Sequence, residues 1–106
     1  MPVNDKVEAF IGIGSNLDSP IEQVQSAILV IDKQEAISVL KQSSLYQTKA
    51  IGPAQPDYIN AVVKIETSLS AEVLLDILMD IEQQYGRQRG PVQYAPRVLD
   101  LDVLLY

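Results

Sequence analysis

Asp100 and Asp102 are the residues whose types and spacing most clearly indicate chemistry. They stand in the apolar stretch PRVLDLDVLLY at 96–106. Side chains two apart on a β-strand share a face, about 7 Å apart along the strand, where like charges repel. A Mg²⁺ ion bound together with substrate phosphates would relieve this repulsion, because the ion prefers carboxylate and phosphate oxygens. A solvated sheet face that carries two acids is the alternative interpretation.

The arginines form the second constellation. Arg87, Arg89 and Arg97 are the only arginines of the chain and lie in one Gly- and Pro-containing stretch, GRQRGPVQYAPR, whereas the lysines are scattered. Guanidinium groups bind phosphate oxygens in bidentate fashion, and such a loop can close over a ligand. A solvated charged loop is again the alternative. Together with the aspartates the arginines favour phosphoryl chemistry, which depends on positioning and charge neutralisation and needs no histidine.

Two further motifs are weaker. In FIGIGSNL, at 10–17, the third glycine of a dinucleotide fingerprint is missing, so a tight strand-to-helix turn is the favoured interpretation. Tyr58 and Asn60 stand two apart where a strand follows the loop TKAIGPAQPD. An aromatic face beside an amide could hold a flat heterocycle. Taken alone, however, a core tyrosine and a turn-capping asparagine explain these two residues better.

Composition narrows the class of protein. The formal net charge of −6 argues against a broad nucleic-acid-binding surface and, with the local arginines, favours a small anionic ligand. The chain has no cysteine, no apolar run of membrane-spanning length and no signal-like N-terminus, so we expect neither a disulfide nor a membrane association. A cytoplasmic location fits this pattern.

Helix signals occur twice. The first helix is predicted to begin near Pro20, with Ser19 as its N-cap, Pro20 at the first helical position and Glu22 closing a capping box. The second helix is predicted to begin after Ser70 and to end at Gly86. The apolar positions expected to face the core are Ile21, Val24, Ile28 and Ile31 in the first helix and Leu74, Ile77, Leu78 and Ile81 in the second. The predicted elements are strands at 7–13, 37–47, 58–67 and 98–105, with the helices at 20–34 and 71–85.

This βαββαβ order predicts an α+β fold in one domain spanning 1–106. The economical arrangement is a ferredoxin-like sandwich, in which a four-stranded antiparallel sheet carries both helices on one face. Leu99, Leu101, Val103 and Leu105 would then lie under the helices, and the two aspartates on the open face.

The motifs IGIGSNL, SLYQT, QPDYINAVVKIET, IEQQYGRQR and APRVLDLDVLLY together resemble the 6-hydroxymethyl-7,8-dihydropterin pyrophosphokinases of folate biosynthesis. The resemblance covers about Val7 to Tyr106 and implies transfer of pyrophosphate from ATP to the pterin. A ferredoxin-like core is also implied.

The resemblance further implies a role for each matching residue. Asp100 and Asp102 would hold two Mg²⁺ ions. Arg87, Arg89 and Arg97 would act on the phosphates, with Arg87 the best candidate for charge stabilisation during transfer. The implied pterin-binding residues are Thr48, Ile51, Tyr58, Asn60 and Tyr94; the implied nucleotide-binding residues are Leu75, Glu82, Arg97 and Val103.

The sequence also departs from the family pattern. Tyr94-Ala95 replaces the usual Trp-Gly, the loop before Tyr58 is one residue short, and family members continue well beyond Tyr106 with further ATP-binding residues. We therefore expect a short form that lacks this C-terminal part, with an uncovered sheet edge that favours a homodimer. A pterin-binding module without catalysis and a purely structural domain are the alternatives to an active enzyme.

Overall fold

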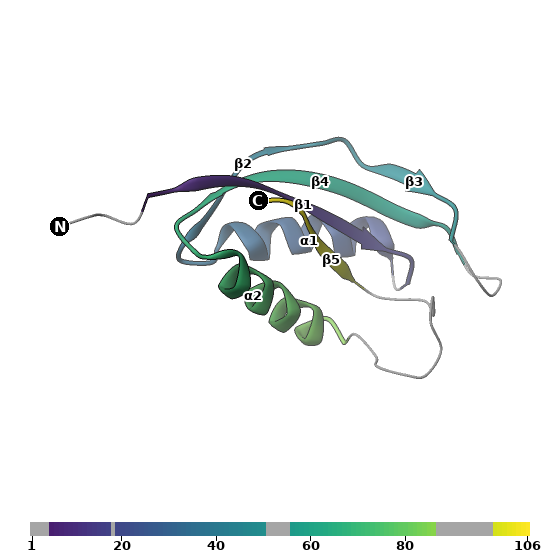
Figure 1. Ribbon diagram of the computed structural model, residues 1–106. Coiled ribbons are helices and arrows are strands. Elements are labelled where there is room, and N and C mark those ends of the chain that lie inside the picture. Colours follow the sequence, from purple (N-terminus) through teal and green to yellow (C-terminus); the bar gives the residue numbers. More distant parts are fainter. Residues whose placement is uncertain (1–4, 18, 51–55, 87–98) are drawn as a thin grey trace.

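The fold is an antiparallel sheet with two helices, described by a computed structural model for residues 5–17, 19–50, 56–86 and 99–106 (Figure 1). The elements in chain order are β1 (Val7–Ser15), α1 (Pro20–Asp32), β2 (Ile37–Gln42), β3 (Tyr46–Thr48), β4 (Tyr58–Thr67), α2 (Ala71–Gln84) and β5 (Asp100–Leu105). The sheet order is β2-β4-β1-β5, and β3 also pairs with β4. This order is consistent with a ferredoxin-like fold.

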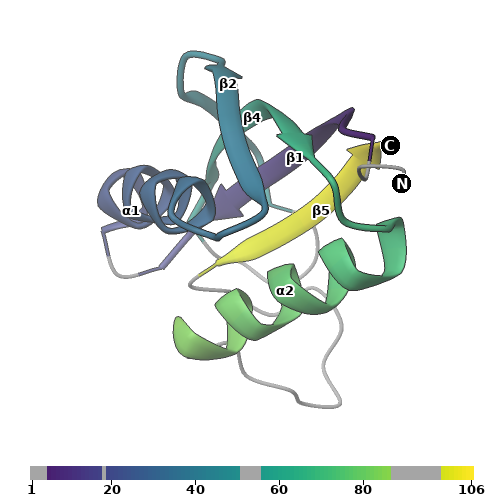
Figure 2. The same cartoon turned by 90° about the vertical axis from the view of Figure 1, so that its left-hand side faces the viewer.

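Both helices cover the same face of the sheet, and none of the described residues forms a helix on the opposite face (Figures 1 and 2). Helix α1 contacts β1, β2 and β4, whereas α2 contacts β5. Among the described residues, the buried hydrophobic cluster between the layers is aliphatic and includes Ile11, Val63, Ile31 and Leu78. The predicted arrangement of the helices on one face is therefore confirmed.

The four-strand count is not confirmed, because the strand expected at 37–47 is divided into β2 and β3. Ser43 stands in the break and still bonds to the neighbouring strand. Its N–H donates to the Val62 carbonyl at 2.8 Å, while its hydroxyl oxygen accepts from the Val62 N–H at 2.9 Å. The serine side chain thus takes an N–H that a strand carbonyl would otherwise take, and the chain bends without losing the pairing.

Strand β1 extends further than predicted. Gly14 and Ser15 pair with Asn60 and Ile59 of β4, so the glycines of FIGIGSNL lie within a strand and the expected tight turn at this point is wrong. Ser15 and the following Asn16 are buried. The Asn16 side-chain amide donates to the Pro56 carbonyl at 3.0 Å, which fastens the end of β1 to the segment that enters β4.

The two helix starts differ from each other. The hydroxyl of Ser70 accepts from the Val73 N–H at 3.2 Å, as an N-cap should, and Gly86 follows α2 with a φ of 82° that favours glycine. Ser19, by contrast, has a φ of 62° and makes no side-chain cap, so the predicted capping box is wrong. Ile21 is also 50% exposed rather than buried, because the buried face of α1 begins at Val24.

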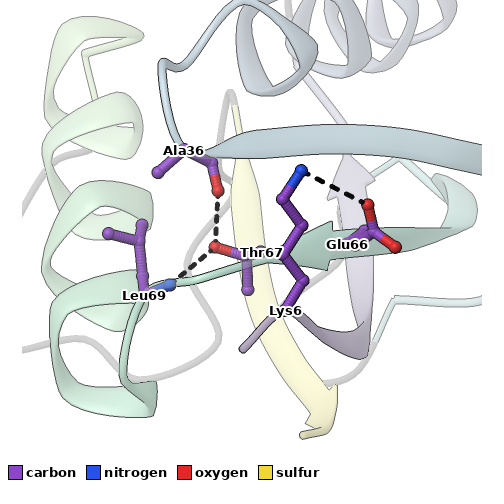
Figure 3. A network of polar contacts seen from close by, with 5 residues as sticks. All are labelled: Lys6, Ala36, Glu66, Thr67 and Leu69. Carbon is purple, nitrogen blue, oxygen red and sulfur yellow. Dashed lines mark hydrogen bonds and ion pairs between the residues drawn. The ribbon is translucent and has the colours of Figure 1, made fainter. Parts of the chain in front are cut away.

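A network of polar contacts surrounds Thr67, the last residue of β4 (Figure 3). Thr67 is buried; its hydroxyl donates to the Ala36 carbonyl at 2.7 Å and accepts from the Leu69 N–H at 3.1 Å. The network ties together the end of β4, the turn before β2 and the turn before α2. On the exposed side, Lys6 forms an ion pair with Glu66 at 3.9 Å, which contributes little in solvent.

Strand β5 is the outer strand beside β1, and its register changes along its length. Val103 pairs with Ile11, but Leu105 pairs with Phe10, so Leu104 is an extra residue, as in a β-bulge. Leu101 is buried and Val103 half-buried as predicted, whereas Leu105 is 63% exposed. The prediction that Leu105 lies under the helices is wrong because the bulge interrupts the alternation. Within the described ranges, no helix has the length and apolar character needed to cross a membrane.

Candidate functional site

The open face of the sheet brings predicted site residues of β3, β4 and β5 together by register. Asp100 pairs with Gly14, Gly14 with Asn60, and Asn60 with Tyr46, so these four residues form one row across β5, β1, β4 and β3. Paired residues of antiparallel strands share a face. A carboxylate at one end of the row and a tyrosine at the other thus lie on the same surface.

The neighbouring rows extend this surface. Asp102 pairs with Gly12, which pairs with Val62, and Thr48 pairs with Tyr58. A cavity of about 380 Å³ lies over these rows, a size typical of a site for a small ligand. The described residues that line it are Gly12, Ile13, Gly14, Tyr46, Thr48, Lys49, Tyr58, Asn60, Ala61, Val62, Asp100, Asp102 and Leu104.

The Asn60 side chain is held by its own neighbours. Its Nδ2 donates to the Thr48 hydroxyl oxygen at 2.8 Å and to the Tyr46 carbonyl at 3.3 Å. The amide nitrogen is therefore occupied, and the Oδ1 atom remains as an acceptor at the cavity. Because the Thr48 oxygen accepts from Asn60, the Thr48 hydroxyl hydrogen can be donated to a ligand. Polar groups fixed in this way give a binding site its directional selectivity.

Asp100 and Asp102 form the acidic end of the cavity, as their spacing predicted. Asp100 is partly buried and Asp102 exposed, and both stand opposite glycines, so no side chain of β1 covers them. Among the described residues, no group of three or more acidic residues could hold a metal by itself. Two carboxylates suit Mg²⁺ when phosphate oxygens and water complete the octahedron, so the donor set fits an ion that binds with a phosphorylated substrate.

Glu82 occupies a different environment from the other acids. It is only 3% exposed, and its Oε2 accepts from the buried N–H of Leu101 at 2.7 Å. Strand β5 ends the sheet order, so the N–H groups on its outer side have no neighbouring strand. Glu82 of α2 thus provides the acceptor for the one amide that lies between the two aspartates.

The other predicted nucleotide-binding residues do not line the cavity. Leu75 is 45% exposed on α2, and Val103 packs against the core from the helix side of β5. With Glu82, they lie on the other side of the edge strand from Asp100 and Asp102. The structure therefore does not bring them into the same cavity, and their nucleotide-binding role stays a prediction.

Several predicted residues lie outside the described ranges. These are Ile51 before β4 and, between α2 and β5, Arg87, Arg89, Tyr94 and Arg97. Their roles in binding pterin or phosphate stay predictions. Both stretches connect to elements that line the cavity, because β4 follows the first and β5 follows the second.

The predicted site residues leave out eight residues of the cavity lining: Gly12, Ile13, Gly14, Tyr46, Lys49, Ala61, Val62 and Leu104. Alternation from Thr48 on β3 and from Asp102 on β5 would have indicated Tyr46 and Leu104. Glycines inside a strand often mark places where a ligand or another backbone segment approaches closely, and this rule would have indicated Gly12 and Gly14. Lys49 follows β3 directly and carries no comparable signal.

The architecture is that of an α+β protein, with both helices on one face of an antiparallel sheet and a polar cavity of the size of a small-ligand site on the other. Comparison with known proteins identifies the family. Residues 10–106 match the model of the 7,8-dihydro-6-hydroxymethylpterin-pyrophosphokinase family. The chain therefore belongs to this family, as the sequence motifs predicted.

Individual relatives agree. Three proteins named 2-amino-4-hydroxy-6-hydroxymethyldihydropteridine pyrophosphokinase are similar to this chain. The relative from Pseudomonas putida is 44% identical over 94% of this chain and 82% of its own length. The relative from Haemophilus influenzae is 46% identical over 94% of this chain and 62% of its own length. The relative from Synechocystis is 42% identical over 92% of this chain and 50% of its own length. The chain thus spans between half and four-fifths of these relatives.

Proposed function

We propose that this chain transfers pyrophosphate from ATP to 6-hydroxymethyl-7,8-dihydropterin. The pterin hydroxymethyl oxygen attacks the β-phosphorus of ATP, and the bond from that phosphorus to the oxygen bridging to the α-phosphate breaks. AMP leaves with the bridging oxygen, and the hydroxyl proton passes to solvent. The observation that carries this proposal is the row Asp100–Gly14–Asn60–Tyr46, which joins a metal-type carboxylate to an amide-and-aromatic surface in one cavity.

The pterin would occupy the end of the cavity formed by β3 and β4. Tyr58 offers a ring for stacking, Asn60 offers an acceptor and Thr48 offers a hydroxyl donor. A pterin is flat and carries both N–H donors and acceptors along one edge, so it matches this combination. Ile51 and Tyr94 would complete the pocket, as the family resemblance implies.

The triphosphate would lie at the β5 end. Asp100 and Asp102 would hold two Mg²⁺ ions, which neutralise phosphate charge and polarise the transferred group when bound. Arg87, Arg89 and Arg97 would contact phosphate oxygens. Because Leu75 and Val103 lie on the helix side of the same edge strand, the nucleoside would pass around β5. Catalysis would then depend on positioning, with the pterin hydroxyl directed at the metal end.

Release of AMP from ATP, with Mg²⁺ and 6-hydroxymethyl-7,8-dihydropterin present, tests this proposal directly. The variant D100N/D102N should abolish pterin-dependent release. The matched control D76N/D80N removes two exposed aspartates of α2 on the opposite side of the sheet and should keep the activity. Equal activity of the wild type and D100N/D102N would refute the assignment of the metal site.

A binding module without catalysis is the second candidate. One observation favours it: Thr48, Tyr58 and Asn60 form a polar and aromatic wall of the cavity that could hold a heterocycle without the two aspartates. Calorimetric titration separates the candidates. Pterin binding without AMP release would support the module, whereas release would exclude it.

A further inference from the structure

The open face of β1 carries two glycines, and the space above each is used differently. A methyl group added at Gly14 would lie 3.1 Å from Asn60 Oδ1 and 3.4 Å from Tyr58 Cδ1. A methyl group added at Gly12 would lie 3.3 Å from both terminal carbons of Leu104. One glycine thus makes room for the polar wall of the cavity and the other for an apolar side chain.

These neighbours differ in how freely they can move. Leu104 is 55% exposed, and its terminal methyls can rotate away into solvent at small cost. Asn60 is fixed through Nδ2 by the Thr48 hydroxyl at 2.8 Å and the Tyr46 carbonyl at 3.3 Å. Its amide therefore cannot turn away from Gly14 without losing one of these bonds.

We propose that Gly14 is a positioning and specificity-determining residue, whose missing side chain lets the Asn60 amide present Oδ1 to the N–H groups of the bound heterocycle. The glycine acts through Asn60 rather than by touching the ligand itself. This inference rests on the proposed function, since it assumes that a pterin occupies the cavity. It extends that function by naming the backbone position that sets the orientation of the acceptor.

Binding of the fluorescent probe 6-hydroxymethylpterin, measured by titration without ATP, tests the proposal. G14A should weaken binding about tenfold, which corresponds to one lost hydrogen bond. E8A is the control on the same strand and face, outside the cavity lining, and should change the affinity less than twofold. N60A should bind as weakly as G14A. The double variant G14A/N60A should bind as N60A does, because the atom displaced by the methyl group is gone.

The outcomes separate the role of Gly14 from the proposed function. If the wild type binds the probe and G14A binds it equally well, the role of Gly14 is refuted while the pterin site stands. If G14A/N60A binds tenfold more weakly than N60A, Gly14 contacts the ligand directly and the proposed route through Asn60 is refuted. If the wild type binds no probe, both proposals fail.

Folding of G14A is checked by thermal unfolding. Should G14A fail to fold, the double variant should recover the fold, because truncation of Asn60 removes the 3.1 Å contact. A double variant that also fails to fold would contradict the inference.

Discussion

Truncation of Glu82 is the most informative change to the scaffold of the site. In E82A, the buried N–H of Leu101 loses its 2.7 Å acceptor. A hydrogen bond to a charged group contributes about 1.5–3 kcal/mol, and loss of the one methylene that alanine lacks, Cγ, adds about 0.8 kcal/mol. We therefore expect E82A to lower the free energy of unfolding by about 3 kcal/mol. For a domain of this size the melting temperature should fall by about 12 °C or more.

E82Q distinguishes the hydrogen bond from the buried charge. Its amide oxygen can still accept from Leu101, so we expect a loss of only about 1 kcal/mol. D80A, two residues earlier on the exposed side of α2, is the control and should stay within about 0.5 kcal/mol of the wild type. Urea unfolding measures all three, and hydrogen exchange of the Leu101 amide locates the effect.

The E82A substitution should also weaken metal binding at Asp100 and Asp102. Leu101 lies between Asp100 and Asp102, so release of its N–H should loosen the strand that carries both carboxylates. Affinity for Mn²⁺ with ATP should fall in E82A more than in E82Q. If E82A unfolds at the wild-type urea concentration, or if the Leu101 amide exchanges no faster, the assignment of Glu82 as the anchor of β5 is wrong.

Three further predictions concern the scaffold. S70A should lower the stability by about 1 kcal/mol in thermal unfolding, since the N–H of Val73 loses its cap, whereas S70D should retain most of it. T67V should cost about 2 kcal/mol in urea unfolding, because the partly buried Ala36 carbonyl and Leu69 N–H both lose the hydroxyl; an unchanged midpoint would contradict the network of Figure 3. The exposed edge at β5 should pair with a second copy, so light scattering should detect a dimer that L105K abolishes; a monomeric wild type at high concentration would refute this.

Much of the fold could be predicted because local signals and burial agree. The β-branched run at 58–67 is β4 with the predicted bounds, and Ser70 and Gly86 begin and end α2 as expected. The break in the second predicted strand could not be foreseen. It depends on the Ser43 side chain reaching the N–H of Val62, and no local pattern reveals such a pairing.

Part of the candidate site could likewise be predicted from the sequence, and part could not. The facing of Asp100 and Asp102 follows from strand alternation, and the structure agrees with it. Glu82 falls four residues after Leu78, on the apolar face of α2, but a charged residue at that position predicts exposure. The outer edge of β5 accounts for its burial, because the Leu101 N–H at that edge takes its acceptor from α2.

The pairing of Gly14 with Asp100 also fixes when the site can assemble. Strand β1 meets β5 only after more than eighty further residues have been added to the growing chain. At the usual rate of synthesis, about 5–20 residues per second, that interval is on the order of ten seconds. Until then, the side of β1 that receives β5 has no partner within this domain. Nascent chains therefore reach the surface of the ribosome with this edge exposed, where a chaperone or a neighbouring strand can bind before the carboxylates arrive.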